Sequence, residues 1–151
     1  MTDQEVPESS WPEHRELREI LSKAMKVGGR TAVAADAVRR VLSPHMRLEE
    51  AFAMPPLELL PRLAAGEITP EMGQIIEISA TLKLQLPRML EQHRLIVTAV
   101  KRLLRAATEE GHHVYVQFAQ KIIHHAQQEE EVLYPAAILV GEYVKLRLGR
   151  E

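Results

Sequence analysis

One pattern occurs twice in this chain of 151 residues: a histidine and, about thirty residues later, the sequence His-x-x-x-Glu. The two copies are His14, His45 and Glu49, and His93, His125 and Glu129. Four residues turn an α-helix about 40° past one full rotation, so each His–Glu pair shares a helix face. A single His-x-x-x-Glu arises easily by chance. Two copies in the same order indicate one site built from both halves of the chain.

The spacing of apolar residues favours helices throughout. No segment shows the period-two alternation of a half-buried strand, and proline and glycine divide the chain into helical stretches. The first two expected stretches are residues 10–27 and residues 30–54, the second with a kink or short break at Pro44. A short connecting helix is expected at 57–65, followed by a helix that begins at Thr69 and is interrupted at Pro87. The last two stretches are 88–109 and 112–147, the latter with a bend at Pro135. The sequence therefore predicts an all-α fold of four main helices, with short connecting helices between the second and third.

The repeated histidines and glutamates fall on the faces expected to be buried. In the fourth helix that face consists of Phe118, Ile122, His125, Glu129, Val132, Ala136 and Leu139. An ionised carboxylate buried without compensation is costly, so inward histidines and glutamates need a common partner. Two divalent cations would satisfy them, and imidazole with carboxylate suits iron, manganese or zinc. His124 would replace His125 if the helix were turned by one residue.

Composition excludes several classes of protein. The net charge is −2 with no basic stripe, which argues against nucleic acid as a partner. The absence of cysteine excludes disulfides and thiolate metal sites. We find no secretory signal and no apolar run long enough to cross a bilayer, so we expect a cytoplasmic protein without a membrane partner. Residues 1–9 are expected to be a flexible tail, and residues 10–151 a single domain.

Four segments resemble the hemerythrin-like (HHE cation-binding) domain family. They are residues 13–16 (EHRE), 45–50 (HMRLEE), 92–94 (QHR) and 125–135 (HAQQEEEVLYP). The resemblance covers nearly the whole chain, and the last segment is especially typical. It implies an antiparallel up-down-up-down four-helix bundle that holds two non-heme iron ions, with an oxo, hydroxo or water bridge.

The resemblance also implies a role for each repeated residue. The four histidines would be terminal ligands, and Glu49 and Glu129 would bridge the metals. Oxygen-carrying hemerythrins have a further histidine one turn after the third-helix histidine, where this chain has Val97. The resemblance therefore implies a di-iron site with one histidine fewer than in the oxygen carriers, and it does not favour reversible oxygen transport.

Three functions are compatible with these observations. The leading hypothesis is a di-iron protein that binds or reacts with dioxygen, nitric oxide or peroxide, in sensing, scavenging or iron buffering. The second is an enzyme that decomposes peroxide or acts as an oxidase, with Tyr115 or His124 as candidate proton donors. The third is a metal-free helical interaction module, with a contact surface around Pro55, Pro56 and residues 57–65. We expect a monomer or a weak homo-oligomer, and the sequence identifies no protein partner.

Overall fold

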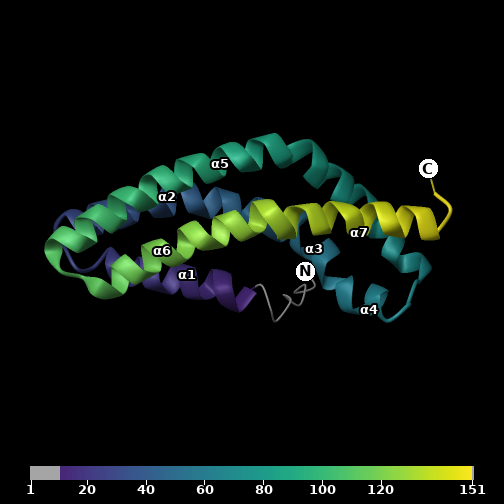
Figure 1. Cartoon of the computed structure of the whole chain (residues 1–151), viewed down its shortest axis with the longest axis horizontal. Coiled ribbons are helices and arrows are strands. Elements are labelled where there is room, and N and C mark those ends of the chain that lie inside the picture. Colours follow the sequence, from purple (N-terminus) through teal and green to yellow (C-terminus); the bar gives the residue numbers. More distant parts are fainter. Residues whose placement is uncertain (1–10, 151) are drawn as a thin grey trace, which may run out of the picture. The chain divides into compact units, whose positions relative to one another are not determined.

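The computed structural model describes residues 11–150, and within that range it contains helices and no strand. The all-α prediction is therefore confirmed, while the tail expected at residues 1–9 lies outside the described residues. In order, the elements are α1 (Trp11–Ala24), α2 (Gly29–Phe52), α3 (Met54–Glu58), α4 (Leu60–Ala64), the 3₁₀ helix η1 (Pro70–Gly73), α5 (Gln74–Glu110), α6 (His113–Gln128), the π-helical turn η2 (Glu129–Leu133) and α7 (Tyr134–Arg147) (Figure 1). Within residues 11–150, no helix combines the length and apolar character needed to cross a membrane.

Helix α5 is continuous through Pro87, so the predicted interruption at this residue was wrong. Proline removes one backbone N–H and crowds the carbonyl four residues earlier, which weakens and bends a helix. The surrounding turns keep their own hydrogen bonds, and α5 extends over 37 residues. Pro44 likewise lies inside α2, which is not broken there.

The described residues form two compact units, and the first comprises residues 11–46 and 92–126. Four helical segments contribute to its hydrophobic core: α1, the first part of α2, the second part of α5, and α6. The core residues are Leu17, Leu21, Ala24, Ala35, Val38, Leu42, Met46, Ile96, Val100, Leu103, Phe118, Ala119 and Ile122. Each segment places its apolar residues on one face, as the three- and four-residue spacing predicted.

The second unit comprises residues 47–91 and 127–150. One core cluster is formed by Ala53, Leu82, Met89, Tyr134 and Ala137, and another by Leu63, Met72, Ile75, Val140 and Val144. Helices α5 and α7 approach closely here. A Cβ added at Gly141 would collide with the side chain of Ser79, whose hydroxyl donates a hydrogen bond of 2.9 Å to the Ala137 carbonyl.

The π-helical turn η2 changes which residues after Glu129 are buried. Its backbone bond runs from the Tyr134 N–H to the Glu129 carbonyl, five residues earlier. This wider turn accommodates one extra residue and rotates the following helix relative to a regular α-helix. Val132 and Leu139, predicted to be buried, are 59% and 65% exposed. The buried residues on α7 are instead Tyr134, Ala137, Val140, Gly141 and Val144.

Candidate metal centre

Five of the six predicted ligands are buried, and the sixth is half-buried. The buried ones are His14, His45, Glu49, His93 and Glu129, and His125 is the half-buried one. The alternative ligand His124 is exposed, so the face of α6 that turns inward carries His125. The described residues thus include buried histidine and glutamate groups that could hold a metal ion.

Helix geometry explains how each His–Glu pair is arranged. His45 and Glu49 both lie on α2. His125 lies on α6, and Glu129 begins η2 directly after it. A four-residue step advances about 6 Å along a helix with little rotation, so histidine and glutamate project from neighbouring turns. Metal sites in helical bundles commonly use two ligand side chains on the same face of one helix.

In the first unit, α2 and α5 bring two histidine rings together. The Nε2 atoms of His45 and His93 lie 2.8 Å apart, and the ring planes meet at 61°. Two imidazole nitrogens bound to one ion at about 2.1 Å, at a right angle, would be about 3 Å apart. The pair therefore has the separation of two neighbouring ligands of a single ion.

Gln92 fixes the orientation of the His45 ring. The Nδ1 atom of His45 lies 2.8 Å from the Gln92 side-chain oxygen. An amide oxygen only accepts hydrogen bonds, so His45 must donate from Nδ1, and Nε2 then carries the lone pair when the ring is neutral. Metal-binding histidines usually donate their second ring N–H in this way, which sets both tautomer and ring direction.

A second histidine contact joins α1 to α6 in the same unit. The Nδ1 atom of His125 lies 2.9 Å from a carboxylate oxygen of Glu13. This contact leaves Nε2 on the opposite side of the ring, as in a carboxylate–histidine–metal arrangement. Glu13 immediately precedes the buried His14, so one turn of α1 supplies both a candidate ligand and a residue that orients another.

In the second unit, Tyr134 lies against two glutamates. Tyr134 is 1% exposed, and its hydroxyl is hydrogen-bonded to Glu129. The negative charge of Glu49 also acts electrostatically on the phenol. Burial, followed by the carboxylates of Glu49 and Glu129, raises the pKa of Tyr134 far above its ordinary value. The phenol therefore stays protonated and acts as a hydrogen-bond donor to a buried carboxylate.

Three functional side chains were not assigned a role from sequence: Glu13, Gln92 and Tyr134. Glu13 and Gln92 each precede a repeated histidine by one residue, which is the signal that sequence analysis could have used. Their contacts are nevertheless with histidines on other helices, His125 and His45. Tyr134 belongs to a core cluster and is also hydrogen-bonded, through its hydroxyl, to Glu129.

Comparison of the chain with protein-family models, with curated proteins and with solved structures finds no match. The chemistry of the site is therefore judged from its own donors. Four imidazoles and two carboxylates without any thiolate form a donor set that fits divalent iron, manganese or zinc. The separation of His45 and His93 and the two oriented rings agree with such a use.

Proposed function

We propose that this chain is a hemerythrin-like, non-heme di-iron protein that binds or reacts with dioxygen, nitric oxide or peroxide. In this proposal the four long helical segments form an up-down-up-down bundle around the metal ions. The observation that carries the proposal is that five of the six repeated histidines and glutamates are buried and the sixth, His125, is half-buried. Burying that many ionisable groups is costly unless cations and hydrogen bonds compensate them.

Each side chain has a defined task in this proposal. His45 and His93 bind one ion, and His14 and His125 bind the other. Glu49 and Glu129 would be shared by the two ions and would balance their charge. When bound, a ferrous pair would supply electrons to an oxidant and a coordination position for a small ligand. Manganese or zinc could occupy the same donors, since availability in the cell decides among such ions.

The surrounding residues hold the donors in place and limit the access of water. Gln92 and Glu13 orient His45 and His125 through their Nδ1 atoms. Buried apolar residues lie within one turn of each histidine: Leu42 and Met46 near His45 on α2, and Ile96 near His93 on α5. Apolar neighbours lower the local dielectric constant, so the interaction between imidazole or carboxylate and a cation becomes stronger.

The environment of Tyr134 favours a second candidate function, peroxide decomposition. Converting two molecules of hydrogen peroxide into two of water and one of dioxygen requires protons to move between oxygen atoms. The Tyr134 hydroxyl is a buried hydrogen-bond donor to Glu129. Its raised pKa makes it a weak acid, so its role in this reaction would be to position Glu129 or a peroxide oxygen through a hydrogen bond.

The optical spectrum of protein loaded anaerobically with iron tests the proposal. On exposure to air and then azide, we expect ligand-to-metal absorption bands that the His93→Ala variant lacks. His113→Ala is the matched control, because His113 is exposed at the start of α6. Absence of such bands in the wild type, or equal bands in the His93→Ala variant, would reject the proposal.

A further inference from the structure

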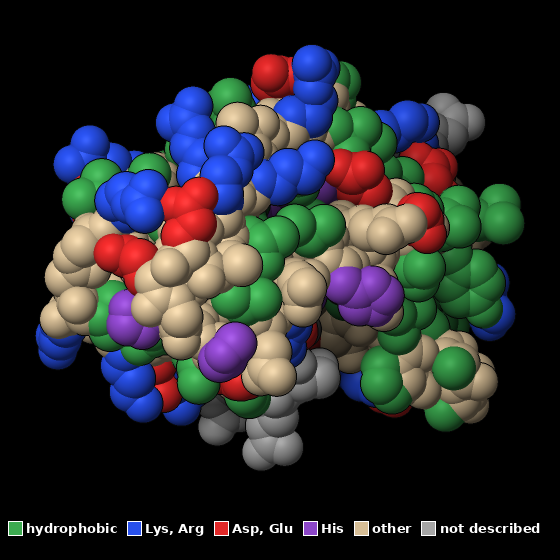
Figure 2. Space-filling model, turned by 60° about the vertical axis from the view of Figure 1, so that its left-hand side comes forward, with side chains coloured by type: hydrophobic (Ala, Val, Ile, Leu, Met, Phe, Trp, Pro, Cys, Tyr) green, Lys and Arg blue, Asp and Glu red, His purple; other side chains and the backbone are tan. Residues whose placement is uncertain are grey.

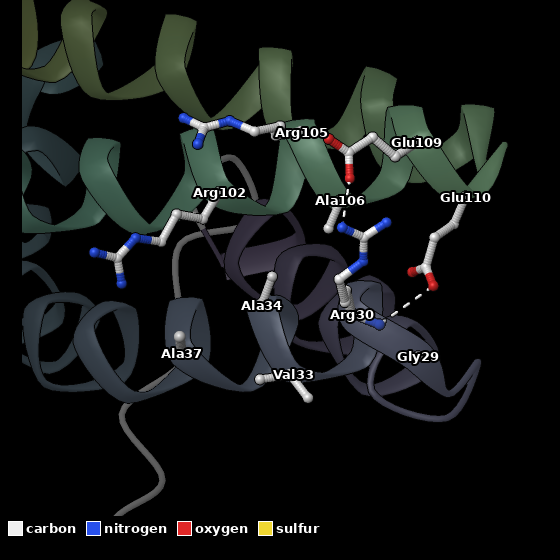
Figure 3. A pocket seen from close by; sticks show the side chains of 10 residues that line it. All are labelled: Gly29, Arg30, Val33, Ala34, Ala37, Arg102, Arg105, Ala106, Glu109 and Glu110. Atoms are coloured by element: carbon white, nitrogen blue, oxygen red, sulfur yellow. Dashed lines mark hydrogen bonds and ion pairs between the residues drawn. The ribbon is translucent and has the colours of Figure 1, made fainter.

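A groove lies within the first unit, between the N-terminal turns of α2 and the C-terminal turns of α5. It has a volume of about 540 Å³. The lining residues are Gly29, Arg30, Val33, Ala34, Ala37, Arg102, Arg105, Ala106, Glu109 and Glu110 (Figure 3). None of these is a proposed metal ligand, so this groove is separate from the donors described above.

Small apolar side chains create the hollow. Ala34 and Ala37 on α2 face Ala106 on α5, and Val33, which is 74% exposed, lies at the edge (Figure 3). Alanine reaches only as far as Cβ, so two helices that meet through alanines leave space above their contact. The floor of the groove is therefore apolar.

Two acidic residues, Glu109 and Glu110, lie at one end of the groove, and both form polar contacts with the start of α2. Glu109 forms an ion pair of 2.8 Å with Arg30 (Figure 3). Glu110 accepts hydrogen bonds from the backbone N–H groups of Arg30 and Thr31 at the start of α2, at 3.2 and 2.6 Å. The hydrogen bonds from Thr31, chiefly through its side chain, hold the pKa of Glu110 below its ordinary value. These contacts tie the start of α2 to the end of α5 at this end of the groove.

Two arginines line the rest of the groove without acidic partners. Arg102 and Arg105 lie one turn apart on α5, and neither forms an ion pair with any residue from 11 to 150 (Figure 3). On the face shown in Figure 2, Lys and Arg side chains gather in the upper part, with single acidic side chains among them. Arg102 and Arg105 thus place two guanidinium groups without acidic partners beside an apolar floor.

We propose that this groove binds a small amphiphilic carboxylate, such as a medium-chain fatty acid, with its head on Arg102 and Arg105 and its chain over Ala34, Ala37 and Ala106. Three arginines and two glutamates line the groove, so the lining has one net positive charge, which matches a single carboxylate. Arginine forms paired hydrogen bonds with a carboxylate. The volume lies within the range of small-molecule sites, roughly 300–1,000 Å³.

Titration calorimetry of the full-length protein with decanoate, below its micellar concentration, tests the proposal. We expect saturable binding by the wild type that weakens at least about tenfold in the R102Q/R105Q double variant. Lys101→Gln is the matched control, because Lys101 is exposed on the same turn of α5 and does not line the groove. Its affinity should stay within about twofold of the wild type. Decan-1-ol and inorganic phosphate, which offer only the chain and only an anionic head, should each bind more weakly than decanoate.

Backbone amide shifts of wild-type protein give a second measurement that needs no variant. Decanoate should shift the NMR signals of Ala34, Ala37, Arg102 and Ala106 before those of other residues. No saturable binding, equal affinity in the double variant, or shifts centred elsewhere would overturn the proposal. Phosphate binding as strong as decanoate binding would also overturn it, because the apolar floor would then contribute nothing.

Discussion

The Nε2 atoms of His45 and His93 lie 2.8 Å apart, on parts of α2 and α5 that belong to the same unit. Both rings are almost completely buried, and Gln92 fixes the tautomer of His45. Such a pair is pre-organised to bind an ion, because little side-chain freedom remains to be lost on binding.

Replacing Gln92 by leucine should weaken metal binding without removing a ligand. The His45 ring would lose the hydrogen bond at Nδ1 and with it the fixed direction of Nε2. Loss of such a contact typically lowers metal affinity about 10–100-fold. Competition with a chromophoric chelator measures the change. Gln120→Leu, at an exposed position of α6, is the control and should bind like the wild type.

Glu129→Ala should remove far more metal than Glu130→Ala. Both residues belong to one acidic run, but Glu129 is buried and Glu130 is exposed. Glu129 also accepts a hydrogen bond from the Tyr134 hydroxyl. Elemental analysis of the two purified variants gives the comparison. Equal metal loss in both would show that the bridging role assigned to Glu129 is wrong.

Tyr134→Phe should keep the metal and slow the reaction with peroxide. The substitution removes the hydroxyl and leaves the ring to fill the same buried space. Loss of a hydrogen bond to a charged acceptor should also reduce the free energy of unfolding by about 1.5–3 kcal/mol. Peroxide consumption and chemical denaturation measure the two effects. Tyr115→Phe, on α6 in the other unit, should change neither, and an unchanged rate for Tyr134→Phe would remove Tyr134 from the reaction.

Val97→His should make the reduced iron centre more resistant to oxidation in air. Val97 is half-buried one turn after His93 on α5, where an imidazole could add a ligand. The larger ring should cost about 1–3 kcal/mol in packing, so the variant is also expected to be less stable. The decay of the reduced spectrum in air gives the rate for both proteins. A long-lived, reversible oxygen adduct in the wild type would instead favour an oxygen carrier.

Periodicity predicted the faces of most helices correctly. The buried positions of α2 include Val38, Leu42, His45 and Glu49, and α5 buries Met89, His93, Ile96, Val100 and Leu103, each set with the three- and four-residue spacing of one helix face. These predictions succeeded because a regular α-helix turns by a constant angle per residue. The same regularity failed beyond Glu129, where the π-helical turn η2 adds a residue and exposes Val132 and Leu139.

The hydrogen bonds around the histidines could not be predicted in the same way. Gln92 reaches His45, and Glu13 reaches His125, across helices far apart in the sequence. Spacing within a helix says which residues share a face, but it does not say which helix lies opposite. Pro87 shows a related limit, because its local preference to end a helix is outweighed by the apolar face of α5, with Leu82 and Met89 both in one core cluster.

The iron content of the wild-type chain after anaerobic reconstitution and removal of excess iron tests the central claim most directly. The account predicts two iron ions per chain, and a smaller number in variants that lack His45, His93 or Glu129. Exposed His124 provides the control, since His124→Ala should retain both ions. One ion per chain would contradict a dinuclear centre. Trace, substoichiometric iron would contradict metal binding altogether and favour the interaction module.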